Sequence, residues 1–348
     1  MYTKELAQAG VVIYRIKGAS GMKPHLCVRF RDEDGIIRDF AVDTSRTPGK
    51  VQPDAYLITH AHSDHFGKST MNSEKAWCSY ETAKALEIRY EKEFCGNRFV
   101  TGSTVSIEGT RVRTIPVYHT PGSCAFMWEN DVGTKILVTG DVKCAADLPK
   151  CDVLITEASY GDPDDPSCHF SEDIRLFEEI VSENAGRTKI AFGAYDFGKA
   201  QKAVSLLREI GYDGPIFMSE KTAELTKCFV ENCGDLETVS LTDRRKNDGE
   251  DLLIVPPPSL SYLPSSYRRF VLTCRRDYPY PNIRMSDHLD ADGLSSMVDD
   301  CDPELTVVYH PNKGSRPDRF AAHLRQKGHE AMSLSQIRNI FNVHDAGK

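Results

Sequence analysis

Residues 57–67 read Leu-Ile-Thr-His-Ala-His-Ser-Asp-His-Phe-Gly, and this stretch decides the fold. Three histidines and an aspartate fall within six residues, directly after a run of apolar residues. That run predicts a short buried strand, so the polar side chains lie on the turn that leaves its carboxyl end. Such a turn can direct His60 and His62 at one metal ion. Asp64 and His65 would then face a second ion.

Imidazole with carboxylate suits zinc, with manganese and iron as alternatives. A polar turn that is rich in histidine by chance is the competing interpretation. The H-x-H-x-D-H spacing directly after a strand favours the metal site, because one histidine alone would carry little weight.

The bulk composition is that of an ordinary globular protein with room for two domains. The chain has 348 residues, of which 40% are hydrophobic and 27% charged. No apolar run approaches the ~20 residues that span a bilayer, and the start of the chain lacks the apolar core of a signal peptide. We therefore expect a cytoplasmic protein without membrane contact. Its eleven cysteines form no C-x-x-C pair, and we expect most to be small buried side chains.

Other predicted strands also end in residues that can bind metal or move protons. These residues are Asp43, His119, Asp141, Glu157 and His310. Each follows an apolar run in the same way as the histidine stretch does. Asp43 could also be a plain turn former, although its place ahead of the histidine stretch favours a functional role. Taken in order behind the histidine stretch, the set predicts one site assembled at the carboxyl ends of several strands.

The sequence pattern changes at about residue 161. From there helices and strands alternate along the chain, which predicts a parallel sheet of its own. We predict a hydrolase domain in residues 1–160 and 283–348, with an inserted α/β domain in residues 161–282. No internal repeat or low-complexity tract stands out.

With these features, the chain resembles the β-CASP nucleases of the metallo-β-lactamase superfamily. The resemblance is carried by the histidine stretch and three further motifs: 157–161 (Glu-Ala-Ser-Tyr-Gly), 286–290 (Ser-Asp-His-Leu-Asp) and 308–310 (Val-Tyr-His). It implies an α/β fold, the four-layered αββα sandwich of the superfamily with an inserted β-CASP-like cap. The segments around 192–201 and 286–294 look closest to compact exonucleases, described as like mRNA 3′-end-processing factors or as partners of DNA-repair ligases.

The resemblance also implies a ligand set for two ions, zinc by expectation and manganese as the alternative. One ion would take His60, His62, His119 and a shared Asp141. The other would take Asp64, His65, Asp141 and His310. Asp43 would support these ligands from behind. Asp64 also counts among the catalytic residues, and Glu157 with His288 would handle the proton of the leaving oxygen.

The implied chemistry is hydrolysis of a phosphodiester. Two cations ~3.5–4 Å apart can polarise a phosphate, and water bound to them reaches a pKa of about 7. The first hypothesis is thus a dinuclear-zinc nuclease, an exonuclease on single-stranded RNA or DNA. The alternatives are a hydrolase of a small ester or phosphodiester, and a nucleic-acid binder without catalysis. Neither polarity nor oligomeric state follows from the sequence, which leaves a homodimer open.

The substrate path is predicted from charge. The net charge of −8 argues against a general nucleic-acid coat protein, but the stretch 244–284 holds eight Lys or Arg against four acidic residues. Arg275 and Arg276 lie beside tyrosines, a combination that suits a single strand, although a solvated loop fits almost as well. Lys199 opens a predicted helix after Gly198, where backbone N–H groups could receive a phosphate.

Overall fold

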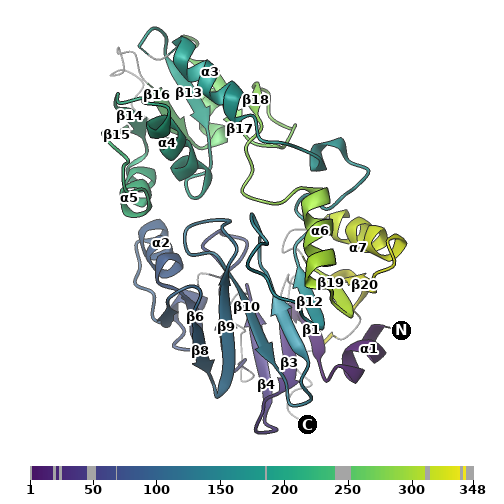
Figure 1. The fold of residues 1–348 in the computed structure, drawn as a ribbon. Coiled ribbons are helices and arrows are strands. Elements are labelled where there is room, and N and C mark those ends of the chain that lie inside the picture. The colour runs from purple at the N-terminus through teal and green to yellow at the C-terminus, as the bar shows by residue number, and fades with distance from the viewer. Residues whose placement is uncertain are drawn as a thin grey trace. The chain divides into compact units, whose positions relative to one another are not determined.

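The computed structural model describes residues 2–18, 21–22, 26–44, 52–67, 69–184, 186–239, 252–309, 314–337 and 340–341. The chain forms two compact units, drawn in Figure 1. The first unit is residues 1–169 with 288–348, and the second unit is residues 170–287.

The second unit begins and ends later in the chain than the predicted insertion, 161–282. Segment 161–169 stays with the first unit because Arg319 and Arg316 of its last long helix pair with Asp162 at 3.2 Å and Asp165 at 3.0 Å. At the other boundary, the segment up to residue 287 stays with the second unit, where Arg284 pairs with Asp173 at 2.7 Å.

The first sheet of the first unit is mixed. Its order is β2 (Gly21–Met22), β1 (Val12–Gly18), β3 (Leu26–Arg31), β4 (Ile37–Val42), β5 (Ala55–Leu57), β6 (Ala76–Ser79) and β7 (Asn97–Phe99), with β21 (Ile340–Phe341) beside β1. Strands β1, β3 and β4 pair antiparallel, and β4 to β7 pair parallel. The β3–β4 hairpin turns at Gly35, whose φ of +74° suits glycine. The parallel half places the ends of β4 and β5 at one edge.

The second sheet is mixed in the same way. Its order is β20 (Ala331–Ser333), β19 (Leu305–Val308), β12 (Val153–Thr156), β11 (Lys135–Val138), β10 (Cys124–Glu129), β9 (Thr110–Pro116) and β8 (Thr104–Ile107). Strands β11, β12, β19 and β20 run parallel, while β8 to β11 form an antiparallel meander. Because β9 and β11 each pair antiparallel with β10, both end at the edge where β12 and β19 end.

The main core lies between these two sheets. Phe30 and Phe40 of the first sheet and Trp128 of the second are fully enclosed, with ring centroids 5.0–5.5 Å apart. Each such ring removes a large apolar area from water, so this contact holds the sheets face to face. The fold is thus α/β with two mixed sheets of the metallo-β-lactamase kind.

Helices cover the sheets of the first unit. These are α1 (Tyr2–Gln8), α2 (Tyr80–Tyr90), α6 (Ala291–Cys301) and α7 (Arg316–Gln326). Ser79 caps α2 by accepting the Thr82 N–H at 3.0 Å, and Asp290 caps α6 by accepting the Gly293 N–H at 2.8 Å. Leu294 of α6 and Phe320 of α7 pack in one apolar cluster with side chains of the second sheet.

The second unit is built on one parallel sheet, as the sequence predicts. Its order is β15 (Leu236–Thr238), β14 (Ile216–Met218), β16 (Leu252–Val255), β13 (Ile190–Gly193), β17 (Arg268–Leu272) and β18 (Asn282–Ile283), and every pairing is parallel. Helices α3 (Ile174–Asn184), α4 (Lys199–Glu209) and α5 (Glu220–Phe229) accompany it. The sequence analysis missed β16, a fully buried central strand directly before three prolines.

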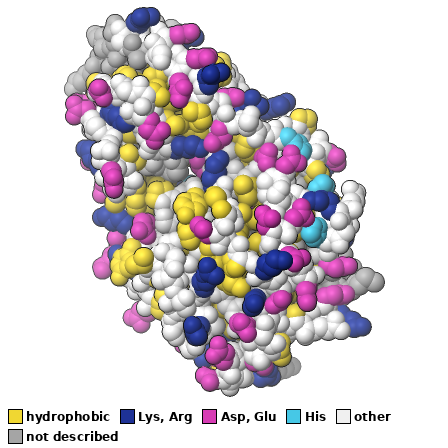
Figure 2. All heavy atoms as spheres, in the orientation of Figure 1, with side chains coloured by type: hydrophobic (Ala, Val, Ile, Leu, Met, Phe, Trp, Pro, Cys, Tyr) yellow, Lys and Arg dark blue, Asp and Glu magenta, His cyan; other side chains and the backbone are white. Residues whose placement is uncertain are grey.

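Short helical turns complete the described chain: η1 (Thr70–Asn72), η2 (Pro166–Cys168), η3 (Pro257–Tyr262) and η4 (Leu334–Gln336). No helix among the described residues is both long and apolar enough to cross a membrane. All eleven cysteines are free, and seven of them are buried, as expected of small core side chains. On the face shown in Figure 2, side chains of both charge signs are interspersed.

Candidate metal centre

The site lies where strand ends of both sheets of the first unit converge. Asp43 follows β4, and the histidine stretch follows β5, its parallel neighbour. In the second sheet, His119, Asp141 and Glu157 follow β9, β11 and β12. These strands end at the same edge, so a local pattern of strand followed by polar residue becomes a cluster in space.

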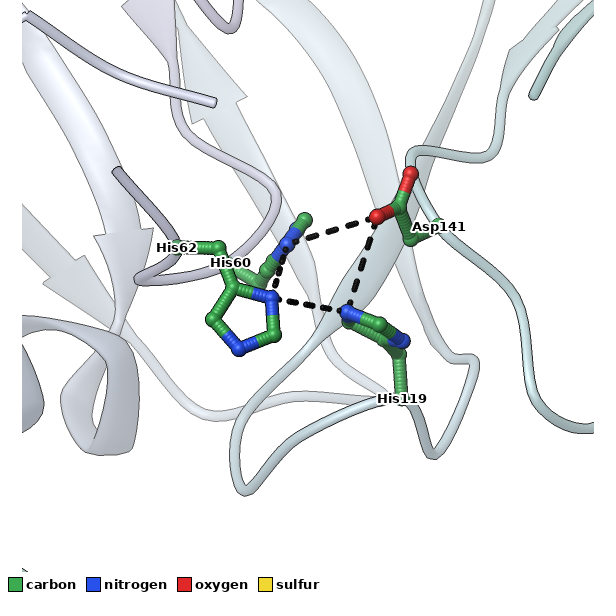
Figure 3. A group of neighbouring side chains, drawn as sticks. All are labelled: His60, His62, His119 and Asp141. Carbon is green, nitrogen blue, oxygen red and sulfur yellow. Dashed lines mark hydrogen bonds and ion pairs between the residues drawn. The ribbon is translucent and has the colours of Figure 1, made fainter. Parts of the chain in front are cut away.

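Four side chains form the first group (Figure 3). His62 Nδ1 lies 3.2 Å from His60 Nε2 and 3.0 Å from His119 Nε2. The Asp141 carboxylate closes the group, at 3.7 Å from His60 and 3.5 Å from His119. Ligands of a tetrahedral zinc ion with bonds of 2.0–2.1 Å lie about 3.3 Å apart. The four atoms are therefore spaced to hold one zinc-sized ion.

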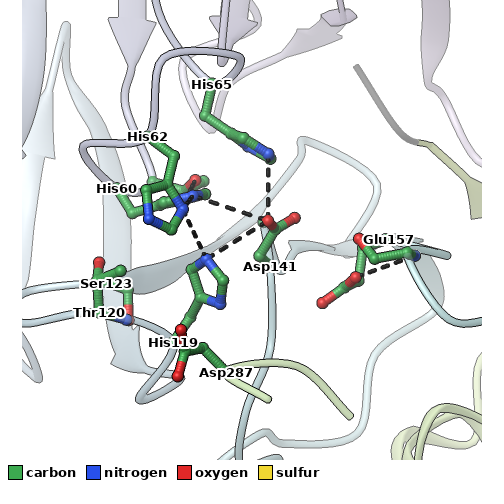
Figure 4. A network of polar contacts seen from close by, with 12 residues as sticks. His60, His62, His65, His119, Thr120, Ser123, Asp141, Glu157 and Asp287 are labelled. Atoms are coloured by element: carbon green, nitrogen blue, oxygen red, sulfur yellow. Dashed lines mark hydrogen bonds and ion pairs between the residues drawn. The ribbon is translucent and has the colours of Figure 1, made fainter. Parts of the chain in front are cut away.

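Asp141 is the centre of the wider cluster, drawn in Figure 4. Its Oδ2 atom lies within 4 Å of four imidazoles, those of His60, His65, His119 and His288. His65 Nε2, at 3.3 Å, and Asp141 Oδ1 are buried, and neither has a hydrogen-bond partner among the residues that the structure describes. Buried polar atoms without partners are rare unless an ion or water joins them. These two atoms therefore fit a second ion that shares the Asp141 carboxylate.

A small cavity of about 10 Å³ lies beside those two atoms. Its polar lining comes from Asp43, His65, Asp141, Thr156 and Glu157, and Tyr309 forms part of its wall. The volume is that of a single small occupant. The cavity and the two possible ligand atoms, His65 Nε2 and Asp141 Oδ1, thus lie on the same side of Asp141.

Asp43 holds the ligands from behind. Its buried carboxylate accepts the Thr59 N–H at 2.9 Å, the Thr59 hydroxyl at 2.8 Å and the Nδ1–H of His65 at 2.8 Å. The hydroxyl of Thr59 also lies 3.0 Å from His60 Nδ1, and because its proton goes to Asp43 it accepts from that ring. Both imidazoles therefore hold a proton on Nδ1, which leaves Nε2 as the nitrogen that faces the site.

Burial and neighbouring charge set the protonation of the cluster. Burial, reinforced by neighbouring histidines, lowers the pKa of His60 well below its usual range, which keeps that ring neutral. Burial opposes charge on Asp141 too, but His65 and His288 outweigh it and hold the pKa of this carboxyl well below its usual range. Burial opposes charge on His65 as well, but Asp141 and Asp43 outweigh it and raise the pKa of this imidazole well above its usual range. An ion bound on that side would therefore displace a proton from His65, whereas His60 is already in the neutral form that binds a metal ion.

Gly140 makes the close approach of the two sheets possible. Its φ is +62°, and a Cβ built on it would lie 2.6 Å from the Cβ and Oγ1 of Thr59. Any side chain at this position would push Thr59 away from Asp43. Glycine is therefore required directly before the ligand Asp141.

Glu157 and His288 form a second group with Asp141. The Glu157 carboxylate accepts the N–H groups of Val142 at 2.7 Å and Ser159 at 3.1 Å. His288 Nδ1 lies 3.0 Å from both of its oxygens. Glu157 is thus buried, and its carboxylate accepts a hydrogen bond from each of these groups. Because His288 donates from Nδ1, its lone pair lies on Nε2, which is the nitrogen that can take up a proton.

The other predicted site residues lie elsewhere or are not placed. Asp64 is exposed and belongs to neither group among the residues that the structure describes. His310 lies outside the described residues. In the second unit, Lys199 is buried and pairs with Asp287 at 3.0 Å, so its ammonium is already engaged. Arg275 is exposed but paired with Asp277, and Arg276 is exposed.

The sequence analysis missed Thr59, although it stands inside the quoted stretch. Threonine in the strand end reads as an ordinary β-former. Its role depends on Asp43, sixteen residues away. The position of the Thr59 hydroxyl, directly before the first predicted ligand His60, was the signal that could have indicated this role.

Comparisons with known proteins agree with this geometry. A family model described as a beta-lactamase superfamily domain matches residues 38–192. An RNase J-like protein of Methanocaldococcus jannaschii is 25% identical over 233 residues, which are 57% of this chain and 54% of that protein. A human DNA cross-link repair 1A protein is 23% identical over 203 residues, 54% of this chain and 19% of that protein. The chain thus spans about half of the first relative and less of the second.

A solved structure supports the fold of the whole chain. The crystal structure of a protein of unknown function from Enterococcus faecalis superposes with a TM-score of 0.63 at 13% identity, covering 92% of this chain and 97% of that one. At this identity the likeness concerns the fold alone.

Residues 38–192 thus match the metallo-β-lactamase superfamily, and the chain has distant homology to RNase J-like and DNA cross-link repair 1A β-CASP nucleases. Its site is that of a metallo-β-lactamase-fold hydrolase, with a His/Asp cluster suited to divalent metal ions.

Proposed function

We propose that this protein is a dinuclear-metal phosphodiesterase that acts as a nuclease on single-stranded RNA or DNA, from an end of the strand. The observation that carries the proposal is the single Asp141 carboxylate among four imidazoles, with unpaired donor atoms on its His65 side. A carboxylate that could be shared between the three-histidine group and the His65 side suits two ions that would act on one phosphate.

One ion would be held by His60, His62, His119 and Asp141. The other would be held by His65 and Asp141, with His310 and Asp64 assigned to it by the family resemblance. Zinc fits this donor set, and manganese is the alternative. Bound ions would supply Lewis acidity and an acidified water at neutral pH. Asp43 contributes by keeping His60 and His65 in the tautomer that can bind them.

Glu157 and His288 are assigned to the proton that the leaving oxygen needs. The Glu157 carboxylate already accepts hydrogen bonds from two N–H groups and from His288. It is therefore not available to a proton donor from solvent. His288 is the partly accessible member of the pair, so it is the residue that can exchange a proton with substrate. In this proposal His288 is the general acid or base, and Glu157 positions it.

We further propose that the second unit is a β-CASP-like cap that binds the strand. The order of the motifs along the chain and the distant homology to RNase J-like proteins support this role.

A second function, hydrolysis of a small phosphodiester, draws support from the charge distribution in the second unit. Of the basic residues in 244–284 that the structure describes, four already have partners within the unit. Arg268 bonds to Asn184, Arg269 to the Leu263 and Pro264 carbonyls, Arg275 to Asp277, and Arg284 to Asp173. The predicted basic patch is therefore partly neutralised.

Digestion of end-labelled oligonucleotides separates the two functions. RNA and DNA strands with 5′-phosphate or 5′-hydroxyl ends are incubated with protein loaded with Zn²⁺ or Mn²⁺, beside a chromogenic phosphodiester. We expect shortening of single strands from one end. Asp141→Asn, which removes the shared carboxylate, is the metal-site control and should be inactive on both substrates. Turnover of the small diester without any cleavage of strands would overturn the nuclease proposal.

A further inference from the structure

Two loops of the second unit meet at the carboxyl edge of its parallel sheet, where the strand order reverses. The chain leaves β13 toward β14 on one side and leaves β17 toward β18 on the other, although β13 and β17 are neighbours. In open parallel sheets, ligands bind outside the carboxyl ends of the strands at such a reversal. The two loops therefore flank the position where a sheet of this kind binds a ligand.

Each loop contributes one tyrosine to this point. Tyr195 follows β13 and Tyr278 follows β17, and their hydroxyl oxygens lie 2.8 Å apart. Tyr278 packs partly against the apolar cluster of Val255 and Val271. Tyr195 is 40% exposed, so part of its ring is open to solvent. An exposed ring is thus anchored through its hydroxyl to a ring that the core supports.

Both loops are held by backbone bonds. The Ala194 N–H donates to the Val255 carbonyl at 2.8 Å, and the Tyr195 carbonyl accepts from the Ala200 N–H at 3.2 Å. On the other side, the Thr273 N–H donates to the Ile283 carbonyl at 3.1 Å and closes the loop at its base. A ring held in this way loses little conformational entropy when a flat ligand stacks on it.

The arginines beside the tyrosines have different electrostatic roles. Arg275 donates to both oxygens of Asp277, and its guanidinium lies 5.9 Å from the centre of the Tyr278 ring. Its charge is therefore largely cancelled locally. Arg276 is exposed and has no side-chain partner among the residues that the structure describes. Only Arg276 of this pair retains an unpaired charge for a phosphate.

We propose that Tyr195 is a stacking surface for an unpaired nucleobase, positioned by Tyr278 and Arg275, and that Arg276 contacts the adjoining phosphate. The proposal rests on the proposed nuclease function and adds where the strand is bound within the second unit. It assigns Arg275 to positioning, whereas the sequence alone favoured a phosphate contact for both arginines. Stacking on an aromatic ring accepts any base, as an enzyme that degrades a strand requires.

Fluorescence anisotropy with uncleavable phosphorothioate single strands tests the stacking surface. The metal-loaded protein is titrated into an ordinary oligonucleotide and into an abasic one of equal length and charge. For Tyr195→Leu, which keeps bulk without a ring, we expect binding of the ordinary strand to weaken roughly 5- to 150-fold. Binding of the abasic strand should not change. Tyr195→Phe keeps the ring and should retain most of the affinity, and thermal melting checks that both variants are folded.

The adjacent arginines serve as matched controls for charge. Arg276→Ala should lower the slope of log affinity against log salt by about 0.7, the value for one phosphate contact on a single strand. Arg275→Ala should weaken binding of the ordinary strand without changing that slope, because its charge is already paired with Asp277.

The outcomes separate this proposal from the function on which it rests. Wild-type protein that binds neither strand would contradict both. Wild-type protein that binds ordinary and abasic strands equally, or a Tyr195→Leu variant that weakens both strands alike, would overturn the stacking site and leave the nuclease intact. A larger fall in salt slope for Arg275→Ala than for Arg276→Ala would overturn the division between the arginines.

Discussion

Replacing Asp43 by asparagine tests whether one buried carboxylate sets the tautomers of two metal ligands. The carboxylate accepts three hydrogen bonds, two from Thr59 and one from His65 Nδ1. An asparagine whose oxygen keeps the Thr59 N–H would turn its amide N–H₂ toward His65. Two donors cannot share that contact, so the ring must move its proton to Nε2, the nitrogen that faces Asp141.

The expected loss follows from that single proton. A ring protonated on Nε2 cannot bind an ion, and replacing such a supporting residue lowers metal affinity or activity by about 10- to 100-fold. This corresponds to roughly 1.4–2.7 kcal/mol of binding free energy. The exchange of charged for neutral hydrogen bonds should also lower the free energy of unfolding, by about 1–3 kcal/mol.

Asp32→Asn is the matched control. Asp32 and Asp43 are each 3% exposed, and Asp32 also accepts three bonds, from Asp34 N–H, Ile36 N–H and Arg38 Nε. It lies at the opposite end of β4 from Asp43. The control should lose comparable stability while it keeps its metal content and its rate.

Metal content by mass spectrometry, chelator competition and hydrolysis of a chromogenic phosphodiester are measured on both variants beside wild type. We expect the variant at Asp43 alone to lose metal affinity and rate. If it bound metal and turned over as wild type does, with only the stability loss that the control also shows, the tautomer argument would be wrong.

Four further predictions follow from single contacts. His62→Ala should lose most bound metal and, with it, thermal stability, because ligation is linked to folding; metal analysis and melting with and without zinc check this. His288→Ala should keep its metals while cleavage falls ~10²–10⁴-fold, and a wild-type rate would refute its proton role. Gly140→Ala should lower the free energy of unfolding by at least about 2 kcal/mol, because φ is +62° and Thr59 occupies the space of a Cβ. Gly133→Ala is the control, since φ is +85° there and the nearest neighbouring atom lies 3.7 Å from the added Cβ. Denaturant titration should show a smaller loss of stability for the control. Hydrogen bonds from Ser167, aided by Arg316, lower the pKa of Asp165 to about 2. This stabilisation is therefore complete above about pH 4 and disappears as the pH falls through 2, and Ser167→Ala should raise the pKa of Asp165 in an NMR titration.

Most helices and strands, and the position of the metal site at the strand ends, could be predicted from the sequence alone. Buried strands were readable as apolar runs, and the polar residue after each run marks a strand end whatever the fold does later. His60, His62, His119 and Asp141 could therefore be predicted as one cluster, and the structure brings them together. The alternation of helices and strands likewise predicted the parallel sheet of the second unit. It failed at β16, because the three prolines directly after its four apolar residues indicated an irregular segment.

Only the tertiary structure decided which polar groups are already engaged. Lys199 and Asp287 are 88 residues apart, and their buried ion pair removes a cation that the sequence offered to a phosphate. Arg275 and Asp277 are only two residues apart, yet the loop conformation after β17 decides that they pair. Thr59 gains its role only when Asp43 lies beneath it. Strand formation depends on neighbours along the chain, whereas the pairing of a charge depends on which distant side chains packing brings within about 3 Å.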